Sequence, residues 1–199
     1  MRRLLVTLFA GLVVAACSSN APSETPIRPW SPASDATTPS AGSARACAGS
    51  ADPTSWIDLT PAGEGFSVRL PASPDAQTST VPVEGGSATV TSWSCASGSD
   101  TSLAVIHVKA NFPDSADQVL DGAVQVMASQ SKATIKSESA ITVDGHPGVA
   151  VVLTGQGVYI DGELVLAGGD LFGVYVAGAA APADNSLAQA FFASLKITE

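Results

Sequence analysis

The stretch GFSVRLP (residues 65–71) indicates the fold class, because its apolar and polar residues alternate. Phe66, Val68 and Leu70 fall on one side of an extended chain, and the polar residues between them fall on the other. Such alternation predicts a half-buried β-strand. Gly65 and Pro71 bound this strand.

Similar patterns predict further strands on both sides of this stretch. They cover residues 56–59, 78–83, 88–95, 102–109, 135–143, 149–154, 158–167, 171–177 and a short closing segment, 196–198. Residues 102–109 (SLAVIHVK) are apolar on both faces over most of their length, which is typical of a strand inside a sheet that is covered on both sides. Turns are predicted at 84–86, 144–148 and 168–170, each rich in glycine.

Two segments have the helical period instead. In residues 116–130 apolar side chains recur every three or four positions, and Ser115 and Gln118 are placed as a capping box. A last helix begins near residues 184–186 and buries Leu187, Ala190, Phe191 and Leu195. The order of elements predicts an α+β fold, an antiparallel β-sheet flanked by two main α-helices.

Four landmarks resemble those of one known superfamily. They are GFSVRLP (65–71), GHPG (145–148), GDLF (169–172) and AFFASLKI (190–197). Together they resemble the PsbP/Mog1-like superfamily, which includes exported bacterial lipoproteins of unknown role. The resemblance covers residues 66–197 and implies that fold and an accessory or binding role. Its motifs are structural, so it implies no catalytic residue.

The N-terminus contains an apolar run, residues 4–16, that follows Arg2 and Arg3 and stops at Cys17. Thirteen residues are too few to cross a bilayer, which takes about 20. The segment Val14-Ala15-Ala16-Cys17 resembles the lipobox of bacterial lipoprotein precursors. The resemblance implies cleavage between Ala16 and Cys17 and attachment of diacylglyceryl and acyl groups to Cys17, enough lipid for stable anchoring. The alternative is an ordinary signal peptide.

Three parts are therefore expected: a signal peptide (1–16), a lipidated N-terminus with a disordered linker (17–46) and one globular domain (47–199). Pro, Ser, Thr, Ala and Gly fill 22 of the 29 positions of residues 18–46, which leaves little to bury. Removal of residues 1–16 takes away two arginines and no acid, which changes the formal net charge from −9 to −11. This charge disfavours nucleic-acid binding. We expect a monomer, extracytoplasmic and lipid-anchored to the cell membrane.

Two cysteines remain once Cys17 is lipidated. Outside the cytoplasm such a pair favours a disulfide, here between Cys47 and Cys95. Free thiols or a redox pair are the alternatives, although the chain has no Cys-x-x-Cys spacing.

Catalysis has few candidates in this sequence. His107 lies in a predicted strand and His146 in a predicted turn, and no Gly-x-Ser-x-Gly motif is present. The pairs Asp144 with His146 and Asp161 with Glu163 both lack a third ligand nearby in sequence, so solvated turn residues explain them equally well. No metal or cofactor is expected.

Three functions follow as hypotheses. The first is a non-enzymatic binding or accessory module of the bacterial cell envelope, with a protein or glycan partner. The second is a carrier of an apolar or lipid ligand between sheet and helix, lined by Trp93, Phe112, Phe172 and Tyr175. The third is an envelope enzyme that uses His107 or His146.

Overall fold

A computed structural model describes residues 47–83, 86–97, 101–110, 112, 115–155, 157–182 and 185–198. The predicted signal peptide with its cleavage site at Ala16, the lipid site at Cys17 and the linker lie outside these residues. So do Glu84 and Gly85 of one predicted turn.

The described chain consists mainly of β-strands. In chain order the elements are β1 (Cys47–Gly49), the short 3-10 helix η1 (Pro53–Ser55), β2 (Ile57–Leu59), β3 (Phe66–Leu70), β4 (Gln77–Val83), β5 (Gly86–Ser97), β6 (Thr101–Lys109), α1 (Ala116–Ser131), β7 (Ala133–Val143), β8 (His146–Gly155), β9 (Val158–Ala167), β10 (Asp170–Gly178), α2 (Ser186–Phe192) and β11 (Lys196–Ile197).

The strands form two sheets. The larger one has the order β1-β5-β6-β10-β9-β8-β7, with β4 also paired to β5, and the smaller one has the order β11-β3-β2. All pairs are antiparallel except β1, which runs parallel to β5. Antiparallel sheets with two α-helices confirm the broad α+β class.

Each face of the large sheet has its own hydrophobic cluster, because successive side chains of a strand point to opposite faces. In β6, Ile106 and Val108 belong to the cluster around α1, whereas Leu103 and Val105 belong to the cluster around β3 and α2. Residues 102–109 were predicted to lie inside a sheet covered on both sides. This is confirmed, since β6 lies between β5 and β10.

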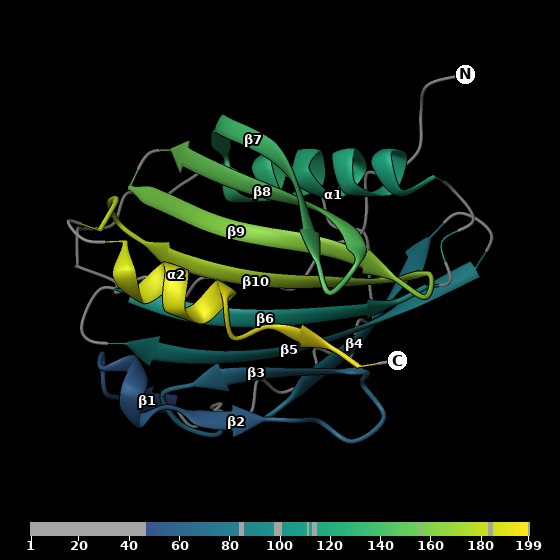
Figure 1. Cartoon of the computed structure of the whole chain (residues 1–199). Coiled ribbons are helices and arrows are strands. Elements are labelled where there is room, and N and C mark those ends of the chain that lie inside the picture. The colour runs from purple at the N-terminus through teal and green to yellow at the C-terminus, as the bar shows by residue number, and fades with distance from the viewer. Residues whose placement is uncertain are drawn as a thin grey trace, which may run out of the picture.

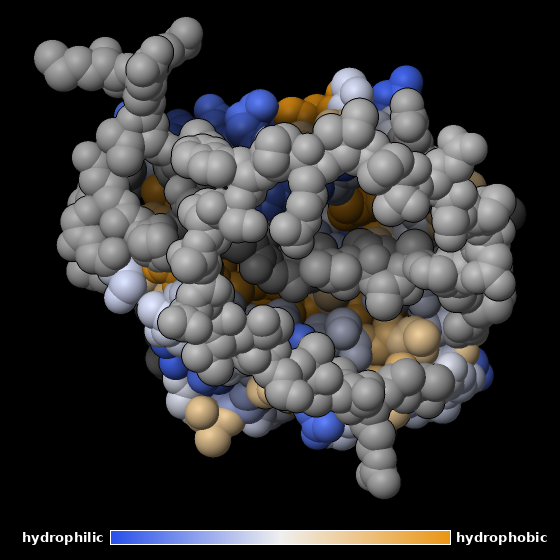
Figure 2. All heavy atoms as spheres, turned by 180° about the vertical axis from the view of Figure 1, so that it is seen from behind, coloured by the Kyte–Doolittle hydropathy of each residue, from blue (hydrophilic) through white to orange (hydrophobic). Residues whose placement is uncertain are grey.

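The two faces are covered differently. Helix α1 packs against β7, β8 and β9, and α2 contacts β10, β9 and β3 (Figure 1). The expected arrangement of two flanking helices is met only in part, because α2 has seven residues and shares its face with the small sheet. Seen from behind, both hydrophilic and hydrophobic residues are visible among the described ones (Figure 2).

Helix α1 agrees with its sequence pattern. Its buried residues include Val119, Leu120, Ala123, Val124 and Met127. The Ser115 backbone N–H and hydroxyl both donate to Gln118 Oε1, at 3.4 and 2.9 Å. The predicted capping box is therefore present.

One local prediction was wrong, and one strand was missed. The predicted turn at 144–148 is shorter, because His146, Pro147 and Gly148 already belong to β8. The short strand β1 was not expected, since three residues carry too little pattern to reveal a strand. By contrast the turn between β9 and β10 is confirmed. Gly168 and Gly169 have φ of 57° and 86°, values that favour glycine.

Candidate functional site

A buried polar cluster surrounds His107 on the face of β6 that β3 covers. The imidazole is 1% exposed. Its Nδ1 lies 2.6 Å from Glu64 Oε2, and its Nε2 lies 3.1 Å from Asp170 Oδ2. The ring stacks on Phe172, the residue opposite in β10, with 4.3 Å between ring centroids.

Three separate parts of the chain build this cluster. Glu64 comes from the loop between β2 and β3, and Asp170 begins β10 directly after the Gly168–Gly169 turn. In the loop, Gly63 and Gly65 have φ of 76° and 70°, so glycine on both sides lets the backbone turn toward β6. The two carboxylates are partly exposed, at 20% and 30% of their side chains.

Lys109 adds an ammonium group to the cluster. Its ammonium lies 3.1 Å from Glu64 Oε2 and donates to the Gly63 carbonyl at 3.1 Å. Burial raises the pKa of Glu64, but hydrogen bonds from Lys109 and His107 and the charges of both residues outweigh it. The net direction of the Glu64 pKa is therefore downward, toward the ionised form.

The cluster fits a structural role better than acid–base catalysis. A general base needs a nitrogen within reach of the substrate proton. Both ring nitrogens of His107 already face carboxylates, and the ring is enclosed by Phe66 and Phe172. Both imidazole nitrogens are therefore already in contact with carboxylate oxygens in this structure.

His146 and Asp144 lie at the β7–β8 turn, outside the His107 cluster. His146 is the first residue of β8 and lies opposite Val143. Asp144 Oδ2 accepts the Ile197 N–H at 2.9 Å, so this carboxylate ties the β7–β8 turn to β11. Within the described ranges, no group of three or more His, Cys, Asp and Glu side chains is placed to hold a metal ion.

Asp161 and Glu163 are strand residues of β9 and are half-buried, not solvated turn residues as their sequence suggested. Burial raises the pKa of Asp161, opposed by a hydrogen bond from the Asn185 side chain. Burial and the neighbouring Asp161 charge raise the pKa of Glu163. Asp161 and Glu163 are two positions apart in β9, so the pair shares one sheet face.

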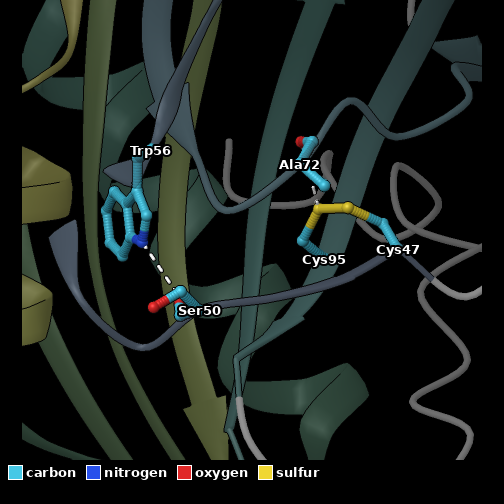
Figure 3. The surroundings of a disulfide bond; sticks show 5 residues. All are labelled: Cys47, Ser50, Trp56, Ala72 and Cys95. Atoms are coloured by element: carbon cyan, nitrogen blue, oxygen red, sulfur yellow. Dashed lines mark hydrogen bonds between the residues drawn. A yellow bond between two sulfur atoms is a disulfide. The ribbon is translucent and has the colours of Figure 1, made fainter. Parts of the chain in front are cut away.

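The structure contains a disulfide between Cys47 and Cys95 (Figure 3). The two residues are direct partners in the β1–β5 pairing, with 4.5 Å between their Cα atoms. Nearby, the Trp56 indole N–H donates to the Ser50 carbonyl at 3.0 Å, which holds the segment after β1 against the core (Figure 3). The bond thus fixes the start of the described domain to β5.

The four aromatic residues expected to line one pocket do not lie together. Trp93 and Phe172 belong to the cluster beside β3 and α2, whereas Tyr175 and Phe112 belong to the cluster beside α1. The large sheet separates the two pairs. The four residues therefore cannot line one ligand pocket between sheet and helix, as the carrier hypothesis expected.

Sequence reasoning singled out His107 but missed Glu64 and Asp170 as its partners. The glycines around Glu64 and the Gly-Gly-Asp sequence before β10 were visible signals of turns. Their approach to His107 depends on β10 pairing with β6, a contact between segments far apart in the chain.

No family model matches this chain, and no curated protein matches it. Among solved structures, the chain is similar to cyanobacterial PsbP from Synechocystis sp. PCC 6803, with 15% identity and a TM-score of 0.46 over 71% of this chain and 92% of that one. It is also similar to a Pseudomonas aeruginosa protein of unknown function described as a putative regulator, with 12% identity and a TM-score of 0.34 over 65% of this chain and 85% of that one. At these values the similarities carry no conclusion about function. In the described segments no helix is long and apolar enough to cross a bilayer.

Proposed function

We propose that the chain is an exported bacterial lipoprotein, anchored to the cell membrane through lipid on Cys17, and that its domain is a non-enzymatic binding or accessory module of the cell envelope. Its partner is an envelope protein or glycan. The proposal combines the lipobox-like segment before Cys17 with the character of the domain that follows the linker.

The observation that carries the proposal is the disulfide between Cys47 and Cys95. Disulfides form and persist in oxidising compartments and are rare in the cytoplasm. Cys47 is also the residue at which the expected linker meets the domain. A load on the tether would therefore pass through the disulfide to β5, inside the large sheet, instead of peeling the three-residue strand β1 away.

The non-enzymatic part of the proposal is supported by the engagement of His107. Its two nitrogens face Glu64 and Asp170, and its ring is buried. A candidate general base with both nitrogens committed is poorly suited to a substrate.

Membrane fractionation of the native host tests the anchor. We expect the wild-type chain in the membrane fraction, released by detergent but not by high salt. Cys17→Ser should remain uncut at its signal peptide, and the neighbouring Ser18→Ala should behave as wild type. A Cys17→Ser chain that is processed and anchored normally would contradict the proposal.

Photo-crosslinking in intact cells tests the binding role. The wild-type chain should give a discrete crosslinked envelope partner. A chain whose residues 1–17 are replaced by an ordinary cleavable signal peptide carries no lipid, and it should give less of this product because its local concentration at the membrane falls. If neither chain yields a specific partner under conditions that capture a known envelope complex, the binding role is wrong even where the anchor is right.

A further inference from the structure

We propose that Glu64, His107 and Asp170 form a protonation-dependent latch, in which a doubly protonated His107 ties the β2–β3 loop and the β9–β10 turn to β6. This inference concerns the domain itself and does not depend on the proposed lipid anchor.

Hydrogen-bond stoichiometry leads to this assignment. A neutral imidazole carries one N–H and one bare nitrogen, whereas an imidazolium carries two N–H groups. Ionised carboxylates only accept hydrogen bonds. His107 has a carboxyl group at each nitrogen, at 2.6 and 3.1 Å. With both carboxyl groups ionised, both contacts are attractive only when the ring holds two protons.

The environment of the ring contains few other charges. Phe66 from β3 and Phe172 from β10 contact the His107 ring, and Thr91 lies opposite His107 in β5; none of these three residues is charged. Lys109, on β6, reaches the cluster through Glu64. The two carboxylates therefore supply the countercharge for the ring and for Lys109.

The latch is asymmetric. Glu64 also contacts Lys109 and lies closer to the ring, whereas among the described residues Asp170 has an ion-pair contact with His107 alone. When the ring loses a proton, the remaining one stays on Nδ1, because a bare nitrogen 2.6 Å from a carboxylate would be the more repulsive arrangement. Rising pH therefore releases the Asp170 side first.

Release on that side would reach beyond the β9–β10 turn. The Gly169 carbonyl, one residue before Asp170, accepts the Phe112 N–H at 3.0 Å. The turn thereby holds the chain that follows β6. Exchange of the Phe112 amide with solvent is consequently a reporter of the latch.

Nitrogen NMR of the histidine rings in the full-length chain, purified in detergent, tests the charge state. The chain has two histidines, and His146→Gln assigns the remaining signal to His107. We expect both His107 nitrogens to be protonated at pH 7. In Asp170→Asn the signal of the doubly protonated ring should disappear at a lower pH than in wild type, because an amide does not favour the cation as a carboxylate does. Asp161→Asn, on the neighbouring strand, should leave the signal unchanged.

Hydrogen exchange, measured on a different variant, tests whether Asp170 holds the β9–β10 turn and the chain after β6. Asp170→Ala removes the acceptor of the His107 Nε2–H. We expect the Phe112 amide to exchange about tenfold faster than in wild type at the same pH. This factor corresponds to the free energy lost with one charge-assisted hydrogen bond. Asp161→Ala should not change it. A bare His107 nitrogen at pH 7, or Phe112 exchange unaffected by Asp170→Ala, would overturn the latch.

Discussion

At the scale of single residues, the charge state and the packing of several side chains are set by their immediate neighbours. Glu64 is held ionised by Lys109 and His107, although its burial alone would favour the neutral acid. The position of the Tyr175 ring depends on two neighbouring glycines. Its ring lies against Gly162 and Gly173, where any side chain would occupy the same space.

Glu64→Gln should reduce the free energy of unfolding by about 1–3 kcal/mol at pH 7, because it removes the carboxylate that contacts both His107 and Lys109. The pKa of Glu64 is lower in the folded state, so its contribution is fully present above the usual range of a glutamate and is lost as the pH falls through the folded-state value. Urea unfolding at several pH values measures this. The difference between wild type and variant should shrink on acidification.

The matched control is Glu138→Gln, at an exposed position on β7. It should be nearly neutral at every pH. An effect of Glu64→Gln no larger than that of the control would argue against the cluster.

Gly162→Ala should destabilise the domain by about 1–3 kcal/mol, since a Cβ there would lie 2.5 Å from Tyr175 Cδ1. In a Tyr175→Val background the same change should cost less, because the ring is gone. Thermal unfolding of the four variants of this cycle measures the coupling. Equal costs in both backgrounds would show that the clash is not with Tyr175.

At the scale of elements, sequence periodicity located most strands and both helices but not their assembly. The strand predicted at 158–167 has those bounds in β9, and the helix predicted at 116–130 is one residue longer in α1. Period-2 and period-3.6 patterns are local, so one sequence suffices to reveal them. The split into two sheets was not predicted, because β11 joins β3 across more than a hundred residues.

The same distinction applies to the candidate site. His107 was found from its own strand, whereas Glu64 and Asp170 become its partners only through the pairing of distant strands. The pairing of Cys47 with Cys95 was predicted from the number of cysteines together with the expected export of the chain, and the structure contains that bond.

Replacing both cysteines, Cys47→Ser with Cys95→Ser, should reduce the free energy of unfolding by about 4 kcal/mol, the chain-entropy value for a loop of 48 residues. Denaturant unfolding of wild type with and without reductant provides the comparison. The reduced wild type should match the double variant. If reduction has no effect on wild type, the disulfide is not formed in the protein.

The end of α1 offers a prediction at the same scale. Lys132 caps the helix with φ of 51°, a left-handed conformation that costs a side chain about 1–2 kcal/mol. Lys132→Gly should therefore stabilise the domain by about 1 kcal/mol. Ser139→Gly, at an exposed and regularly paired position of β7, should destabilise it instead. Their melting temperatures should move in opposite directions.

At the scale of the whole molecule, the proposal describes an acidic domain held at a membrane only by lipid on one cysteine. The chain has a formal net charge of −9, which becomes −11 without residues 1–16, so anionic headgroups would repel it. The affinity for the membrane must then come from acyl chains.

The intact mass of the protein extracted from its native membrane tests this account most directly. We predict a polypeptide that starts at Cys17, carries diacylglyceryl and acyl groups on that residue and is lighter by two hydrogens for the Cys47–Cys95 bond. A mature chain that starts at any other residue, or one that starts at Cys17 without lipid, would contradict it.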